Sequence, residues 1–139
     1  MDAKLLLWPV LVLVLLTFVT SGLMLRARIR EMKQRRIHPQ KAVTRGQYAQ
    51  VLQDTQAADQ YQNLLEAPLL FYIAMLAAYV TSQASPSLLG LAWLYVAARL
   101  AHWAIHIGYN KVMHRFAAFA LSMLVLLCIW LRFAWAWLA

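Results

Sequence analysis

Four long apolar runs constrain this chain more than any other feature of its sequence. They cover about residues 5–25, 64–81, 88–107 and 116–138. A helix needs about 20 consecutive, mostly apolar residues to cross a bilayer, and the runs lack the alternating segments of about ten residues that build membrane barrels. The sequence therefore predicts an all-α integral membrane protein. We expect a four-transmembrane-helix bundle that occupies residues 1–139 as a single domain.

The composition leaves no room for a soluble domain beside these runs. Apolar residues make up 63% of the 139 positions and charged residues 13%, whereas a soluble domain has roughly 45–50% and 25%. The single cysteine, Cys128, lies within an apolar run, which excludes an intrachain disulfide and a cysteine metal cluster. We find no Ser-His-Asp or Cys-His arrangement and no glycine-rich phosphate loop, so ordinary hydrolase and kinase classes have no support.

The positions of the cations predict the orientation. Between residues 26 and 45 there are eight Lys and Arg and one acid, Glu31, and the connection between the last two runs carries Lys111 and Arg115. The turn at 82–87 carries no charge. Basic connections stay in the cytoplasm, so we expect both termini on the non-cytoplasmic side, in a bacterial inner membrane.

The basic cytoplasmic segment at 26–62 connects the first two runs. We expect the first helix to continue through residues 26–36 until His38-Pro39 stops it, followed by a short helix and loops as far as Gln62. Nothing else in the chain offers a groove or a stacking platform for nucleic acid. We therefore interpret the cations as a topology signal that also attracts anionic membrane lipid.

Polar side chains within the runs are few, and an ionisable one at membrane depth costs roughly 2.5–3.5 kcal/mol, which makes it a candidate for function. Asn63 and Glu66 are three residues apart and share a helical face. The third run carries a polar and aromatic stripe with spacings of 4, 3, 4 and 3 residues, formed by Tyr95, Arg99, His102, His106 and Tyr109.

The short turn at 82–87 sets the register of the second and third helices. Residues equidistant from its midpoint near 84–85 lie at similar depth, which places Glu66 level with about His102 or Trp103 and Asn63 level with about His106. Arg99 then lies about 5 Å deeper than Glu66. We therefore predict a Glu66–Arg99 ion pair facing the bundle interior, which either pins the helices together at little net energy or organises a site.

The spacing of His102 and His106 would also suit a metal ion with Glu66 as third ligand. Two histidines and one distant acid are a weak signal, so we predict no metal site and interpret both imidazoles as lining a pocket. The connection from Gly108 to Arg115 is dense in hydrogen-bond donors. It would either form a polar pocket, in which a small anion meets a hydrophobic molecule from the lipid, or only anchor the loop to headgroups.

Two motifs carry a resemblance to a known family. The stretch from Asn63 through Glu66 and Pro68 resembles the N-x-x-E-x-x-P-x-F signature of the membrane-associated proteins in eicosanoid and glutathione metabolism, the MAPEG family. Arg99-x-x-His102, followed by Arg115, resembles the family's R-x-x-H segment and its arginine at the cytoplasmic end of the bundle. By motif the resemblance covers about residues 59–120.

The resemblance implies a homotrimer that binds the cofactor glutathione between subunits near the cytoplasmic side. Asn63 and Glu66 match the family's glutathione contacts. Arg115 would be catalytic, because positive charge beside the sulfur favours the thiolate, which is the nucleophile. The remaining expected binding residues share one face of the third helix and are Arg99, His102, His106 and Tyr109.

The sequence also departs from the family's pattern at the expected ligand site. Asp59 stands where the well-studied enzymes tend to carry arginine, so one expected clamp for a glutathione carboxylate is absent. His106 stands where those enzymes tend to carry tyrosine, and the interval from Glu66 to Pro68 is one residue shorter than in the eicosanoid enzymes.

Three functions follow from these observations. The first is a glutathione-dependent transferase or peroxidase acting on a lipophilic small molecule with an electrophilic centre. The second, favoured by Asp59, is a non-catalytic protein of the same fold that binds lipid or a partner. The third is a small proton-coupled exporter with Glu66 as the coupling residue, which we rank last because the first run has no ionisable group.

Overall fold

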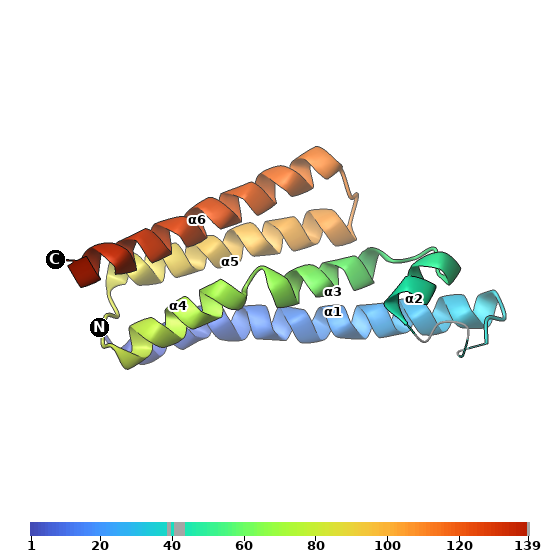
Figure 1. Ribbon diagram of the computed structural model, residues 1–139, viewed down its shortest axis with the longest axis horizontal. Helices are drawn as coiled ribbons and strands as arrows, with labels where there is room; N and C mark the ends of the chain where they lie inside the picture. The colour runs from blue at the N-terminus through green and yellow to red at the C-terminus, as the bar shows by residue number, and fades with distance from the viewer. Residues whose placement is uncertain (39, 41–43, 139) are drawn as a thin grey trace.

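The computed structural model describes residues 1–38, 40 and 44–138. All regular elements of this part of the chain are helical (Figure 1). In chain order they are η1 (Ala3–Leu6), α1 (Leu7–Gln34), α2 (Arg45–Val51), α3 (Gln56–Glu66), α4 (Leu69–Val80), α5 (Pro86–Ile107) and α6 (Val112–Leu138). Four helical stretches are long and apolar enough to cross a membrane, with α3 and α4 together forming the second. The predicted all-α integral membrane protein with four spanning helices is confirmed.

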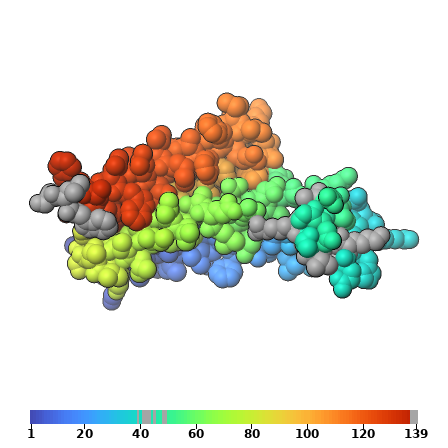
Figure 2. All heavy atoms as spheres, in the orientation of Figure 1, coloured from blue at the N-terminus to red at the C-terminus, as the bar shows by residue number. Residues whose placement is uncertain are grey.

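The four spanning stretches run side by side along the long axis of the molecule. Figure 1 shows both termini and the α4–α5 turn at one end, and the α5–α6 connection and α2 at the other. In the space-filling view, α3 and α4 lie between α6 and α1 on the face in view (Figure 2). The two basic connections therefore share one end of the bundle, which is the arrangement that the charge pattern predicts.

The core lies where α4 and α5 face the other helices. On α4 the buried residues Phe71, Ala74, Met75 and Ala78 recur at helical spacing, and the alanines allow close approach of neighbouring helices. A polar contact joins the first and third spans, because the Trp103 Nε1–H donates to Thr20 Oγ1 at 2.8 Å. The outward faces remain apolar and exposed, as lipid contact requires.

Two helix boundaries differ from the predictions. Helix α1 ends at Gln34, before residue 36, because Arg36 adopts a left-handed conformation with φ 52° and the Ile37 N–H donates to the Met32 carbonyl, a common way to end a helix. Helix α5 begins at Pro86, which the prediction placed in the turn. Proline suits the first helical position, and the Ser85 hydroxyl caps this end by accepting from the Leu88 N–H at 3.3 Å.

The second span is broken at Ala67 and Pro68, where α3 ends and α4 begins. Proline has no N–H to donate to the carbonyl four residues earlier, so the helix bends there. Side chains of α5 satisfy carbonyls at the break. The Tyr95 hydroxyl donates to the Ala67 carbonyl at 3.3 Å, and Arg99 Nη2 donates to the Asn63 carbonyl at 3.2 Å.

Candidate functional site

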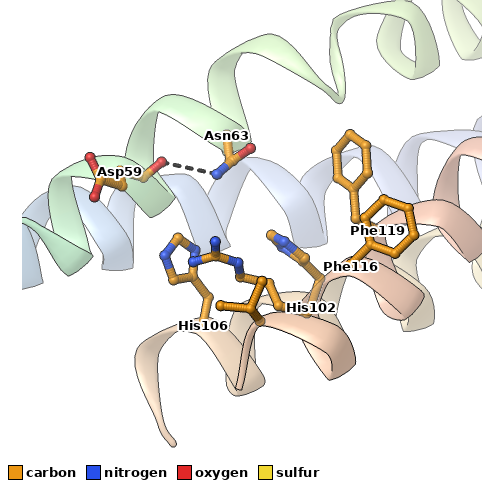
Figure 3. Close-up of a pocket in the computed structure, with 8 residues that line it drawn as sticks. Asp59, Asn63, His102, His106, Phe116 and Phe119 are labelled. Atoms are coloured by element: carbon orange, nitrogen blue, oxygen red, sulfur yellow. Dashed lines mark hydrogen bonds between the residues drawn. The ribbon is translucent and has the colours of Figure 1, made fainter. Parts of the chain in front are cut away.

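A pocket of about 400 Å³ lies between α3, α5 and α6 near the basic end of the bundle. Helix α3 contributes Asp59 and Asn63 to its wall, and α5 contributes His102 and His106 (Figure 3). Helix α6 contributes Arg115 and an apolar wall formed by Val112, Phe116 and Phe119. One side of this polar pocket is therefore charged and hydrogen-bonding, and the other side is apolar.

The stripe on α5 forms one wall because its residues recur at helical spacing. Tyr95, Arg99, His102 and His106 are all buried, as expected for one inward face. The stripe does not reach Tyr109, whose side chain is 59% exposed. Helix α5 ends at Ile107, and a Cβ on Gly108 would lie only 2.7 Å from the Ala104 carbonyl oxygen, so the chain can turn sharply there only with glycine.

The predicted Glu66–Arg99 ion pair is wrong. Glu66 is exposed and its Oε1 accepts from Gln62 Nε2 at 2.7 Å, whereas Arg99 is completely buried and donates to the Asn63 carbonyl. Arg99 forms no ion pair within the described residues, and its Nε and Nη1 have no hydrogen-bond partner there.

The error has two physical causes. The prediction assumed an unbroken second helix, but the break after Glu66 changes which side chains face α5. It also placed the midpoint of the turn too late, because α5 begins at Pro86. The observed register brings Gln60 to His106, where we had expected Asn63.

The two histidines differ in their contacts. His106 Nδ1 lies 2.5 Å from Gln60 Oε1, and Gln56 Nε2 donates to the His106 carbonyl. His102 is also buried, but its Nδ1 has no hydrogen-bond partner among the described residues. Its ring faces His106 at 5.8 Å and Phe119 at 5.9 Å between centroids. His102 therefore retains an unused hydrogen-bonding atom at the wall of the polar pocket.

Arg115 is held at the mouth of the pocket by its own connection. Arg115 Nη1 donates to Asn110 Oδ1 at 3.1 Å. Asn110 has a left-handed backbone with φ 50°, which asparagine tolerates better than most residues, and its N–H donates to the Ile105 carbonyl at 2.8 Å. On the outside of this connection, the Tyr109 hydroxyl lies 3.0 Å from His114 Nδ1.

On α3, Asn63 and Asp59 stand one turn apart on the opposite wall. Asn63 Nδ2 donates to the Asp59 carbonyl at 3.2 Å, drawn as a dashed line in Figure 3. The Asp59 carboxylate accepts from the Thr55 hydroxyl at 3.1 Å. An acid therefore lies in the pocket wall at the position where the family's well-studied enzymes tend to carry arginine.

The structure thus brings together four of the seven predicted site residues, namely Asn63, His102, His106 and Arg115. Arg99 lies buried on the same face of α5, while Glu66 and Tyr109 lie on the surface. The sequence-based reasoning missed Gln60, which is completely buried beside His106. Its signal was the spacing of three residues between Gln60 and Asn63, which places both on one helical face.

A second missed residue is Glu31, which lies six positions beyond the first apolar run. Its carboxylate accepts from the Gln53 N–H at 2.8 Å, the Asp54 N–H at 3.1 Å and Arg35 Nη1 at 2.7 Å. The pKa of this carboxyl lies below its ordinary value. The hydrogen bond from the Gln53 N–H is the largest cause, and the hydrogen bond from the Arg35 guanidinium is the next. Glu31 thereby ties the loop before α3, and with it one pocket wall, to α1.

The comparisons with known proteins support the resemblance over nearly the whole chain. The family model described as MAPEG family matches residues 6–135. No curated protein and no solved structure matches the chain.

Proposed function

We propose that this chain, which belongs to the MAPEG family, binds glutathione in the polar pocket and is a glutathione-dependent transferase or peroxidase for lipophilic electrophiles at the cytoplasmic side of the membrane. The observation that carries the proposal is the joint position of Arg115, Asn63 and His102 around one pocket with an apolar wall. Family membership alone supports only a MAPEG-like membrane protein.

The residues of the polar pocket suit the chemistry of glutathione, a tripeptide with two carboxylates, one ammonium group and one thiol. The Asn63 amide offers a donor to carboxylate and peptide oxygens, and the Arg115 guanidinium offers positive charge to the thiolate. The Asp59 carboxylate disfavours a ligand carboxylate at its own position in the pocket wall. A volume of about 400 Å³ lies within the range of small-molecule sites.

Glutathione, when bound, supplies the sulfur nucleophile. In the proposed reaction Arg115 places positive charge near that sulfur and favours its thiolate form. Asn110 keeps the Arg115 guanidinium at the mouth of the pocket. Phe116 and Phe119 form the side from which a lipophilic molecule enters, and exclude water from it.

We further propose that the active assembly is a homotrimer, as the resemblance implies. Glu66 is exposed on α3 and does not line the polar pocket. The family motif implies that Glu66 contacts glutathione. Because Glu66 lies outside the polar pocket of its own subunit, it would contact a glutathione molecule that lies between this subunit and a neighbouring one. The outward position of Glu66 is therefore consistent with a site between copies of the chain.

The test is calorimetric titration of glutathione into the detergent-purified protein. We expect saturable binding that Arg115→Ala and Asn63→Ala both weaken. Lys111→Ala is the matched control, because Lys111 is an exposed cation of the same connection that does not line the pocket. Equal affinities for the Arg115→Ala variant and the unmodified protein would remove Arg115 from the site.

A second candidate function is favoured by one observation, the Asp59 carboxylate in the pocket wall. A fixed negative charge there repels an anionic peptide, which suits a non-catalytic family protein that binds lipid or a partner. In that case titration with millimolar glutathione gives no heat, and mass spectrometry of the purified protein identifies a co-purified lipid instead.

A further inference from the structure

A second pocket of about 290 Å³ lies at the basic end of the bundle, between α1, the start of α3 and the end of α5. Among the described residues, it shares no lining residue with the polar pocket. Helix α1 contributes Leu23, Arg26, Ala27 and Arg30, and opposite them lie Asp54 and Ile107. We call this second space the arginine pocket.

The spacing of the α1 residues explains how they form one wall. Arg26 and Arg30 are four residues apart, so their side chains neighbour each other on one face of the helix. Leu23 lies one turn before Arg26 on the same face, and Ala27 adds little bulk between the arginines. The wall therefore changes from apolar to doubly cationic within two helical turns.

The depth of the arginine pocket follows from the length of the first apolar run. Residues 5–25 form 21 helical positions, which span about 32 Å at about 1.5 Å per residue, close to the roughly 30 Å of a bilayer's hydrocarbon core. Arg26 is thus the first residue beyond that core. Arg30 lies about 6 Å farther out, so the two guanidinium groups reach the layer of lipid phosphates.

The two arginines of the arginine pocket differ in their ion-pair partners. Arg30 Nη2 lies 3.2 Å from Asp54 Oδ2, and the Asp54 N–H is bound by the Glu31 carboxylate. Arg26 has no ion-pair partner within the described residues. The two arginines and one acid leave a net charge of one positive unit, with Arg30 held in place and Arg26 available to an anion.

We propose that the arginine pocket binds the phosphate group of an anionic phospholipid. Arg26 and Arg30 are the phosphate ligands, since guanidinium groups bind phosphate with paired, charge-assisted hydrogen bonds. Leu23 and Ile107 contact the glycerol and the start of an acyl chain at the inner edge of the pocket. This site is separate from the proposed glutathione site and does not depend on it.

The test uses the full-length protein in detergent and native mass spectrometry with added phosphatidylglycerol. We expect the double variant Arg26→Gln/Arg30→Gln to weaken binding of this lipid by about ten-fold or more. The matched control is Lys33→Gln/Arg36→Gln, which removes the same charge from exposed positions of the same segment. We expect the control to change binding by less than about two-fold.

Three outcomes would overturn the proposal. If both double variants weaken phosphatidylglycerol binding equally, the diffuse positive charge of the segment attracts the lipid. If phosphatidylcholine binds as tightly as phosphatidylglycerol, the site does not distinguish lipids by the net charge of the headgroup. If inorganic phosphate alone competes as well as the lipid does, the site takes free phosphate. Should the double variant fail to fold, Arg26→Gln alone, which keeps the Arg30–Asp54 pair, is expected to weaken binding by about three-fold or more.

Discussion

Replacing Glu31 by glutamine tests how the loop before α3 is held. The two carboxylate oxygens accept three hydrogen bonds, two of them from backbone N–H groups 22 and 23 positions along the chain. Glutamine has nearly the same shape but only one acceptor oxygen, so its amide group brings a donor against at least one existing donor. Glu31 is only 8% exposed, which leaves little room for water to replace the lost acceptor.

A hydrogen bond to a charged group contributes about 1.5–3 kcal/mol. Losing one such bond raises the equilibrium constant for local opening of the loop by about 10- to 100-fold. Hydrogen exchange measured by mass spectrometry on a peptide that contains Gln53 and Asp54 reports this opening. We expect exchange at these two amides to accelerate by that factor in Glu31→Gln, while peptides from α4 and α5 keep their protection.

The matched control is Glu66→Gln, the same chemical change at an exposed position whose hydrogen bond comes from Gln62 in its own helix. Unchanged exchange at Gln53 and Asp54 in Glu31→Gln would refute the reasoning, as would an equal acceleration in the control.

The same carboxylate predicts a pH dependence with a definite sign. The pKa of Glu31 lies below its ordinary value of 4.5, chiefly because the Gln53 N–H and the Arg35 guanidinium favour the charged form. A lowered pKa in the folded protein stabilises the loop above the unfolded pKa, and this contribution is lost as pH falls through the folded pKa. Protection of the two amides, corrected for intrinsic exchange, should therefore be constant near neutral pH and fall below about pH 4.5. If protection of these two amides falls in the same way in the Glu31→Gln variant, the pH dependence belongs to another group.

Four substitutions test the rest of the reasoning. Tyr95→Phe removes the bond to the carbonyl at the helix break and should lower the free energy of unfolding in detergent by about 1 kcal/mol; no loss would mean that this bond does not stabilise the bend. Glu66→Gln should change the free energy of unfolding by less than about 0.5 kcal/mol, and a larger loss would indicate a buried partner of Glu66. Asp59→Arg should tighten glutathione binding by about ten-fold in titration, given about 1.4 kcal/mol from one charge-assisted bond; weaker binding would contradict the proposed repulsion. Arg115→Ala should abolish conjugation yet leave the thermal midpoint unchanged, and a normal rate would exclude its catalytic role.

The spans could be predicted because membrane insertion depends on local properties of the chain. Run length and apolar content suffice to find four helices, and the charge-free turn before Pro86 suffices to make the second and third antiparallel. The α5 face from Tyr95 to His106 could be predicted as well, since helical periodicity alone determines which residues share it.

Contacts between helices were harder to predict, because they depend on register and on breaks. A shift of the turn midpoint by one or two residues changes the partner of His106 from Asn63 to Gln60. Pro68 was visible in the sequence, but the direction in which it turns Glu66 depends on how α3 packs against α1. Glu31 looked like one acid among cations, because two of its three hydrogen-bond donors are backbone N–H groups, which no side-chain pattern reveals.

The break at Pro68 divides the second span into two segments that are held by different contacts. Helix α3 is fastened at its far end, through the loop that Glu31 holds, whereas α4 lies deeper in the apolar part of the bundle. Gln60 and the Asn63 carbonyl bind His106 and Arg99 on α5, so α3 forms a polar pocket wall that is fixed to α5. Beyond the break, α4 presents apolar side chains to the lipid, so one span combines a polar wall at one end with a lipid-facing surface at the other.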